Sequence, residues 1–174
     1  MLDFWFVEID PDKWWTASAS FDDLIRRRFG GLLERAIRGE LHEWRSSAKG
    51  RLAEVIVLDQ FSRNIYRGSP QSFAQDAMAL ALAQEAVAAN AHRQLTDVEC
   101  TFLLLPYMHS ESKFIHTQAE SLYREFAPKL NFEFELKHKA IVDRFGRYPH
   151  RNKMLGREST QEEIEFLQEP GSAF

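Results

Sequence analysis

The feature that most constrains the fold of this chain is a repeated pattern of helix starts, with no convincing stretch of strand-like alternation. Thr96 with Glu99, and Thr160 with Glu163, have the spacing of capping boxes, in which the two side chains bond free backbone N–H groups. Apolar residues recur three or four positions apart, for example between 115 and 126. The pattern predicts an all-α fold: seven or eight helices with short loops, in a single compact domain over residues 1–174.

Individual helix boundaries follow from the same signals. Ser20 is expected to begin a helix, and Ser69-Pro70 reads as the N-cap and first-turn proline of an alanine-rich helix. The segment 52–61 is apolar almost all round, which predicts a central helix. Gly146 is expected to end a helix in the left-handed conformation.

Composition narrows the class of protein. The chain has 174 residues, 44% of them hydrophobic, and a net charge of −4, which argues against a protein that coats nucleic acid. One cysteine, Cys100, excludes an internal disulfide and is expected to be a packed thiol in a reducing compartment. The N-terminal segment lacks the basic leader of a signal peptide, and no apolar run approaches the ~20 residues of a membrane span. We therefore expect a cytoplasmic protein with no nucleic-acid or membrane partner.

Three polar segments stand at or just beyond apolar stretches. The first polar segment is Asp59–Arg67, the second is Arg144–Asn152 and the third is Pro106–Glu111. Arginines near a core need anionic partners, because an unpaired buried charge costs several kcal/mol. Either the chain or a ligand supplies those partners.

In the first polar segment, Asp59 falls on the inward face of the central helix, and Arg63 follows one turn later. One interpretation is a buried structural ion pair between these two residues. The other is that Asp59 orients Arg63 while Asn64 and Arg67 turn toward a ligand, since a guanidinium binds carboxylate or phosphate oxygens in pairs. Both interpretations stay open.

The second polar segment continues past Gly146 on a turn fixed by Pro149. Exposed side chains on a constrained turn are a stronger sign of function than the same residues on a regular helix. The candidates for ligand binding there are Arg147, His150, Arg151 and Asn152. The alternative is that the arginines bind helix C-terminal carbonyls and the acidic residues Glu162, Glu163 and Glu165.

The third polar segment holds the candidates for acid–base chemistry. His109 is a side chain that titrates near neutral pH, and Glu111 is either its partner or a general base. In the alternative, Ser110 or Glu111 caps the helix that starts near Ser112, and His109 is a packing residue. No metal-ligand spacing, phosphate-binding loop or dinucleotide fingerprint occurs, so no metal or cofactor is expected.

Five sequence motifs occur in the following order: Phe4-Trp5-Phe6, Leu58–Gly68, Met108–Glu111, Arg144–Asn152 and Leu155–Thr160. In these motifs the chain resembles the bacterial family called domain of unknown function 924, over nearly its whole length. The resemblance implies an all-α fold similar to tetratricopeptide repeats and implies no established activity. Val7 stands where glycine is usual, and Ser62, where proline is usual, is expected to loosen the helix end.

The leading hypothesis is one pocket that binds a small anionic molecule. His109 and Glu111 are the acid–base groups if a hydrolase or transferase reaction takes place. The residues expected to contact the ligand are Arg63, Asn64, Arg67, Arg147, His150, Arg151 and Asn152. The rival hypothesis is a non-enzymatic, tetratricopeptide-like module that clamps an acidic peptide. In a third hypothesis, all three polar segments form networks of ion pairs that fix helix ends and bind no ligand.

Overall fold

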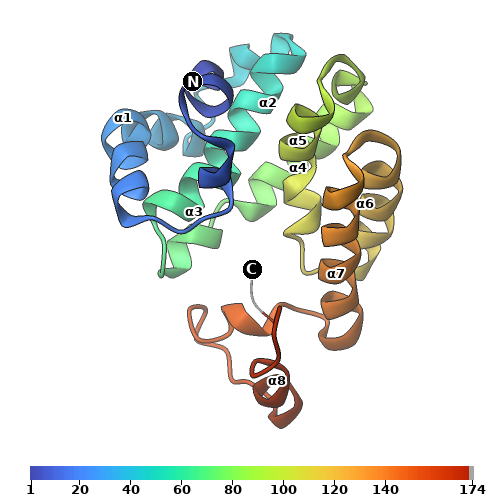
Figure 1. The fold of residues 1–174 in the computed structure, drawn as a ribbon. Coiled ribbons are helices and arrows are strands. Elements are labelled where there is room, and N and C mark those ends of the chain that lie inside the picture. Colours follow the sequence, from blue (N-terminus) through green and yellow to red (C-terminus); the bar gives the residue numbers. More distant parts are fainter. Residues whose placement is uncertain (173–174) are drawn as a thin grey trace.

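A computed structural model describes residues 1–172, and in this range the chain is all-helical, without strands. The α-helices are α1 (Ala19–Ile37), α2 (Ala48–Ile56), α3 (Ser62–Ile65), α4 (Asp76–Ala88), α5 (Asp97–Met108), α6 (Lys113–Phe126), α7 (Lys129–Phe145) and α8 (Gln161–Phe166). Helices α5, α6 and α7 follow one another through short loops and pack side by side, while α8 lies apart at the C-terminal end (Figure 1). The all-α, single-domain prediction is confirmed. The likeness to tetratricopeptide repeats stays a prediction.

The central helix is where the apolar run predicts it. Helix α2 runs through a π-helical turn, Val57–Phe61, straight into α3, and all residues from 52 to 62 are buried. Ser62 continues the helix with φ −59°, so its presence does not open the helix end. The chain therefore carries one long buried helix through the middle of the fold.

Helix starts follow the capping signals in part. Both predicted capping boxes form, at α5 and at α8. The N-cap of α1 is Ser18 rather than Ser20, since the Ser18 side chain accepts the backbone N–H of Phe21. Ser69 does not cap α4, because its hydroxyl donates instead to the carbonyl of Tyr66. Pro70 consequently opens a separate 3-10 turn, and α4 begins six residues later at Asp76.

An aromatic cluster fills the N-terminal half of the core. Trp5 lies 1% exposed and packs edge-on against Phe61 and Phe102, both at 5.6 Å between ring centroids. Trp14 joins them by donating its indole N–H to the Trp5 carbonyl at 2.9 Å. Burying a side chain of this size stabilises the fold by about 1.5–3 kcal/mol or more. This cluster fixes α1 and the N-terminal segment against the central helix.

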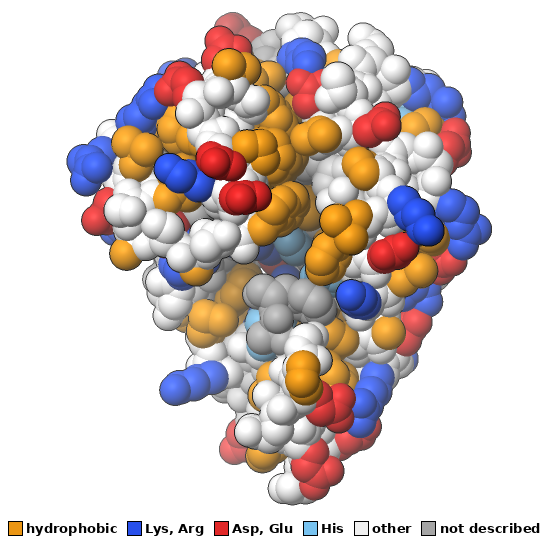
Figure 2. All heavy atoms as spheres, viewed as in Figure 1, with side chains coloured by type: hydrophobic (Ala, Val, Ile, Leu, Met, Phe, Trp, Pro, Cys, Tyr) orange, Lys and Arg blue, Asp and Glu red, His pale blue; other side chains and the backbone are white. Residues whose placement is uncertain are grey.

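The C-terminal segment has a small core of its own, formed by Ile141, Val142, Phe145, Tyr148 and Phe166. Gly146 ends α7 with φ 70°, the left-handed conformation expected there. A 3-10 turn, Pro149–Arg151, then leads the chain back toward the start of α4. In Figure 2, hydrophobic side chains gather in a band down the middle of the helical body.

Candidate functional site

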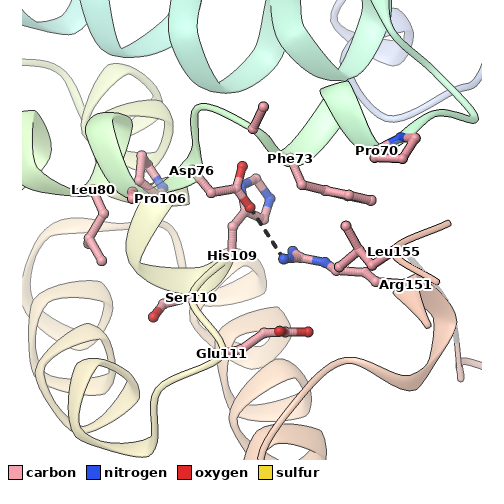
Figure 3. A pocket seen from close by; sticks show the side chains of 12 residues that line it. Pro70, Phe73, Asp76, Leu80, Pro106, His109, Ser110, Glu111, Arg151 and Leu155 are labelled. Carbon is pink, nitrogen blue, oxygen red and sulfur yellow. Dashed lines mark hydrogen bonds and ion pairs between the residues drawn. The ribbon is translucent and has the colours of Figure 1, made fainter. Parts of the chain in front are cut away.

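A cavity of about 410 Å³ lies where α4 begins, α5 ends and the 3-10 turn Pro149–Arg151 approaches them. Figure 3 shows its polar groups, Asp76, His109 and Arg151, close together, with apolar side chains to either side. The lining residues are Pro70, Phe73, Ala74, Asp76, Ala77, Leu80, Pro106, His109, Ser110, Glu111, Arg151 and Leu155.

His109 enters this cavity from the C-cap of α5 and is held from behind by Asp59. Its Nδ1 lies 2.8 Å from Asp59 Oδ1, and the Asp59 side chain is fully buried. Arg63 Nη1 lies 3.0 Å from the same oxygen, and the Gln60 amide donates to the other at 2.5 Å. Burial raises the pKa of Asp59, but the positive charge of Arg63 and the bond from His109 outweigh it, so this pKa lies well below its usual range.

Asp59 owes its position to the π-helical turn of the central helix. This turn spans Val57–Phe61, so Asp59 is its middle residue. A π turn adds a residue to a helical turn and occurs frequently at functional sites. Arg63 still reaches Asp59 from one turn further along, at 18% side-chain exposure.

The surroundings of His109 favour the neutral imidazole. Burial lowers the pKa of His109 first, and the charge of Arg63 lowers it further, while Asp59 acts in the opposite direction. A neutral ring whose Nδ1 faces a carboxylate carries its proton on Nδ1 and leaves a lone pair on Nε2. No residue from 1 to 172 hydrogen-bonds that Nε2. This arrangement suits a general base.

Arg151 closes the other side of the polar group. Its Nη1 donates to Asp76 Oδ2 at 3.2 Å, and Asp76 also takes two bonds from Arg63, at 2.9 and 3.1 Å. The guanidinium carbon lies 4.7 Å from the centre of the Phe73 ring and 4.6 Å from that of Tyr148. Arg151 is only 6% exposed, yet its buried Nε has no hydrogen-bond partner within residues 1–172. Burial and the nearby charge of Arg63 lower the pKa of Arg151.

Glu111 also lines the cavity, but its carboxylate is occupied. It accepts two bonds from Arg157, at 2.6 and 2.9 Å, and one from the backbone N–H of Tyr148 at 2.8 Å. Burial raises the pKa of Glu111, but the Arg157 bonds outweigh it and hold the pKa below its usual value. Asp59, and not Glu111, is thus the acid that holds His109.

The capping alternative for the third polar segment holds for neither Ser110 nor Glu111. Ser112 itself caps α6, accepting the backbone N–H of Ile115, and Ser110 supports it by accepting the N–H of Ser112 at 3.2 Å. His109 is packed, as that alternative expects, but it also reaches the cavity.

Several expected ligand contacts lie outside the cavity lining and bond other groups. Asn64 and Arg67 both bond Asp22 of α1, Arg67 with distances of 2.6 and 2.9 Å. Arg147 bonds both oxygens of Glu163, at 2.6 and 2.7 Å. These pairs match the interpretation in which the arginines find partners within the chain.

The other two candidates of the second polar segment, Asn152 and His150, also lie outside the cavity lining. Asn152 is 1% exposed and donates to Ser159 Oγ at 3.1 Å, so it braces the chain leading to α8. The His150 ring lies 5.6 Å from that of Tyr148, and burial lowers the pKa of His150 to about 4. Of the seven residues expected to contact a ligand, Arg151 alone is part of the cavity lining. Arg63 is linked to that lining by its hydrogen bond to Asp76.

A second buried cluster supports the loop that carries His109. His116 Nδ1 lies 2.7 Å from Glu135 Oε1, both side chains fully buried, and His116 Nε2 lies 2.9 Å from the Ser110 carbonyl. The Tyr148 hydroxyl donates to the Met108 carbonyl at 2.5 Å. Two carbonyls that flank His109 are thereby fixed to α6 and to the C-terminal segment.

Comparison with known proteins identifies the family. The model of a bacterial protein family of unknown function, DUF924, matches residues 1–171. The chain belongs to this family. A solved structure of a protein of unknown function from Agrobacterium tumefaciens is 36% identical with a TM-score of 0.91, and the match covers 96% of this chain and 94% of that one. None of the curated proteins compared matches the DUF924 chain.

Some features of this DUF924 member have no signal in the sequence. Asp76, which joins Arg63 to Arg151, lies in the first turn of α4. Acidic residues are common at that position because the helix dipole stabilises a negative charge there, so Asp76 does not stand out in the sequence. Arg157 stands in a loop and gives no hint that it bonds Glu111. Within residues 1–172, no three potential ligands gather as a metal site, and no helix is long and apolar enough to cross a membrane.

Proposed function

We propose that the cavity at His109 binds a small anionic molecule, carboxylate or phosphate, and that His109 and Asp59 act there as a general-base pair in a hydrolase or transferase reaction. The observation that carries this proposal is that one cavity contains both an incompletely bonded arginine, Arg151, and a histidine, His109, whose Nδ1 is held by Asp59 and whose Nε2 bonds no residue from 1 to 172. Arg151 is the anchor for the anion. His109 is the group that takes a proton.

Hydrogen-bonding capacity supports an anion rather than a cation. The carboxylates of Asp76 and Glu111 each accept three N–H groups already, from arginines and backbone. Arg151 has five N–H groups and gives one of them to a described residue. Among the charged side chains of the cavity, the unmet capacity is therefore that of a donor, which a ligand oxygen satisfies.

The proposed chemistry follows the logic of an acid–histidine pair. Asp59 holds the tautomer and orientation of His109, so that Nε2 accepts a proton from a water or a substrate hydroxyl. The oxygen so activated attacks the carbonyl carbon or phosphorus of the bound substrate, and the bond from that atom to the leaving oxygen breaks. Protonated His109 returns its proton to the leaving oxygen, and the Arg151 guanidinium stabilises the negative charge that develops. Asp59 stays ionised throughout, since Arg63 holds it in that state.

The experiment is a calorimetric titration with inorganic phosphate and with acetate, on the wild type, Arg151→Gln and Arg144→Gln. Arg144 is the matched control, because it is half exposed and bonds Glu162 outside the cavity. We expect binding in the wild type and Arg144→Gln, and at least a tenfold loss in Arg151→Gln. Equal binding by all three proteins would refute the anchor role of Arg151.

Turnover is tested with His109→Asn, on the anionic substrate p-nitrophenyl phosphate. General-base catalysis contributes about 10²–10⁴-fold, so a loss of that size with anion binding retained is the expected result. An unchanged rate would leave an anion-binding protein without this chemistry. An acidic peptide that binds through Arg151 where phosphate and acetate do not would favour the interaction module.

A further inference from the structure

We infer that the ligand of this cavity is amphipathic, with an anionic head at Arg151 and an aliphatic or aromatic body along α4. The inference rests on the proposed function, because it takes the anion site at Arg151 as given. What it adds is the class of substrate. A bare inorganic anion leaves most of this cavity unused.

One wall of the cavity is apolar and continuous along a helix face. Phe73, Ala77 and Leu80 lie four and three positions apart, so they line one side of the chain as it passes from the 3-10 turn into α4. Pro106 adds to this wall from α5. Leu155, which is 36% exposed, faces the cavity from the C-terminal segment.

Polar and apolar groups are separated within the cavity. Figure 3 places Leu80 and Pro106 together on one side, Pro70 and Leu155 on another, and Arg151 with Asp76 between them. The volume, about 410 Å³, lies in the ~300–1,000 Å³ range of small-molecule sites. A ligand with its charge at Arg151 therefore extends its body over apolar side chains in either direction.

The body of the ligand has few polar partners available. Asp76 and Glu111 have their oxygens engaged by arginines, so an amine on the ligand finds no free carboxylate. Apart from Asp76, the cavity residues from Pro70 to Leu80, together with Pro106, have alanine, leucine, phenylalanine and proline side chains. An acyl or aryl group gains from covering these side chains, whereas a polyhydroxylated body loses hydration without replacement bonds.

The test is a chain-length series of acetate, butyrate and hexanoate, with dissociation constants measured by calorimetry. Each CH₂ group that contacts the wall is worth about 0.8 kcal/mol, so affinity should rise about fourfold per added CH₂. Phenyl phosphate against inorganic phosphate repeats the comparison with the other head group. Arg151→Gln should weaken every member of both series.

Leu155→Ser removes one apolar contact and should flatten the dependence on chain length without abolishing acetate binding. Leu130→Ser is its control, since Leu130 is 63% exposed and lies outside the cavity lining. Equal affinities for acetate and hexanoate, with both lost in Arg151→Gln, would overturn the amphipathic ligand and leave the anion site standing. Chain-length dependence that persists in Arg151→Gln would indicate non-specific binding and overturn the inference. No Arg151-dependent binding of any probe would end the proposed function itself.

Discussion

His109 and Asp59 are fifty residues apart in the chain, and their side chains meet at 2.8 Å inside the fold. Arg63 bonds the same aspartate and continues to Asp76, which in turn bonds Arg151. Five side chains from the central helix, the start of α4, the end of α5 and the C-terminal turn thus form one network. The groups proposed to bind and react are also groups that hold these four segments together.

Arg63→Ala should strongly destabilise the protein. The change leaves Asp59, fully buried, and Asp76 without their shared guanidinium. Removing one partner from a buried ion pair costs about 3–5 kcal/mol. For a chain of this size that lowers Tm by roughly 6–20 °C, measurable by differential scanning calorimetry.

Arg28→Ala is the matched control for Arg63→Ala. Arg28 pairs with Glu8 at 2.7 Å, but both side chains are more than 40% exposed. Exposed pairs contribute little, so Tm should hardly change. If the two variants melted at the same temperature, the network at Asp59 would not be the stabilising element described above.

The tautomer of His109 is a second prediction. Nitrogen-15 NMR of the imidazole should show Nδ1 protonated and Nε2 unprotonated at pH 7, because Nδ1 faces Asp59. Burial and Arg63 lower the pKa of His109, so protonation of the ring should begin only below the pH at which a free histidine titrates. A ring that is doubly protonated at pH 7 would contradict its role as a base.

The helical class of this fold is readable from the sequence because its signals are local. Capping boxes at Thr96 and Thr160 involve residues three positions apart, and both form. The inward face of Asp59 follows from helical geometry alone. Contacts such as His109 with Asp59 join distant segments, and no local pattern specifies which acid the histidine meets.

The sequence also does not specify which partners the arginines bind. Sequence position indicates that Arg67 and Arg147 need anionic partners, but it does not distinguish a ligand from Asp22 or Glu163. Asp22 lies 45 residues before Arg67, on a different helix. Partner choice is a property of tertiary packing, and it decides which arginines remain available to a ligand.

Tyr148→Phe should weaken the support of the His109 loop. The lost hydroxyl bonds the Met108 carbonyl at 2.5 Å and lies 3.2 Å from His116 Nε2, while the ring that packs on Arg151 is kept. A buried group left unsatisfied costs roughly 1–3 kcal/mol, which urea unfolding will measure. Tyr66→Phe is the control, since no residue from 1 to 172 hydrogen-bonds the Tyr66 hydroxyl, and its stability should be close to wild type. Comparable losses in the two variants would argue against a specific role for the Tyr148 hydroxyl.

Glu163 should contribute to the loss of stability in acid. Hydrogen bonds from Arg147 lower the pKa of Glu163 from 4.5 to about 2, and its side chain is 2% exposed. A carboxyl whose folded pKa is lowered stabilises the protein fully above its unfolded pKa, and that stability is lost as the pH falls from about 4.5 toward 2.

Glu163→Gln keeps the side-chain shape but cannot titrate. Its free energy of unfolding should therefore be lower than wild type at pH 7 and approach the wild-type value near pH 2–3. Urea unfolding of both proteins at several pH values checks this, and parallel curves for the two would rule out Glu163 as the titrating group.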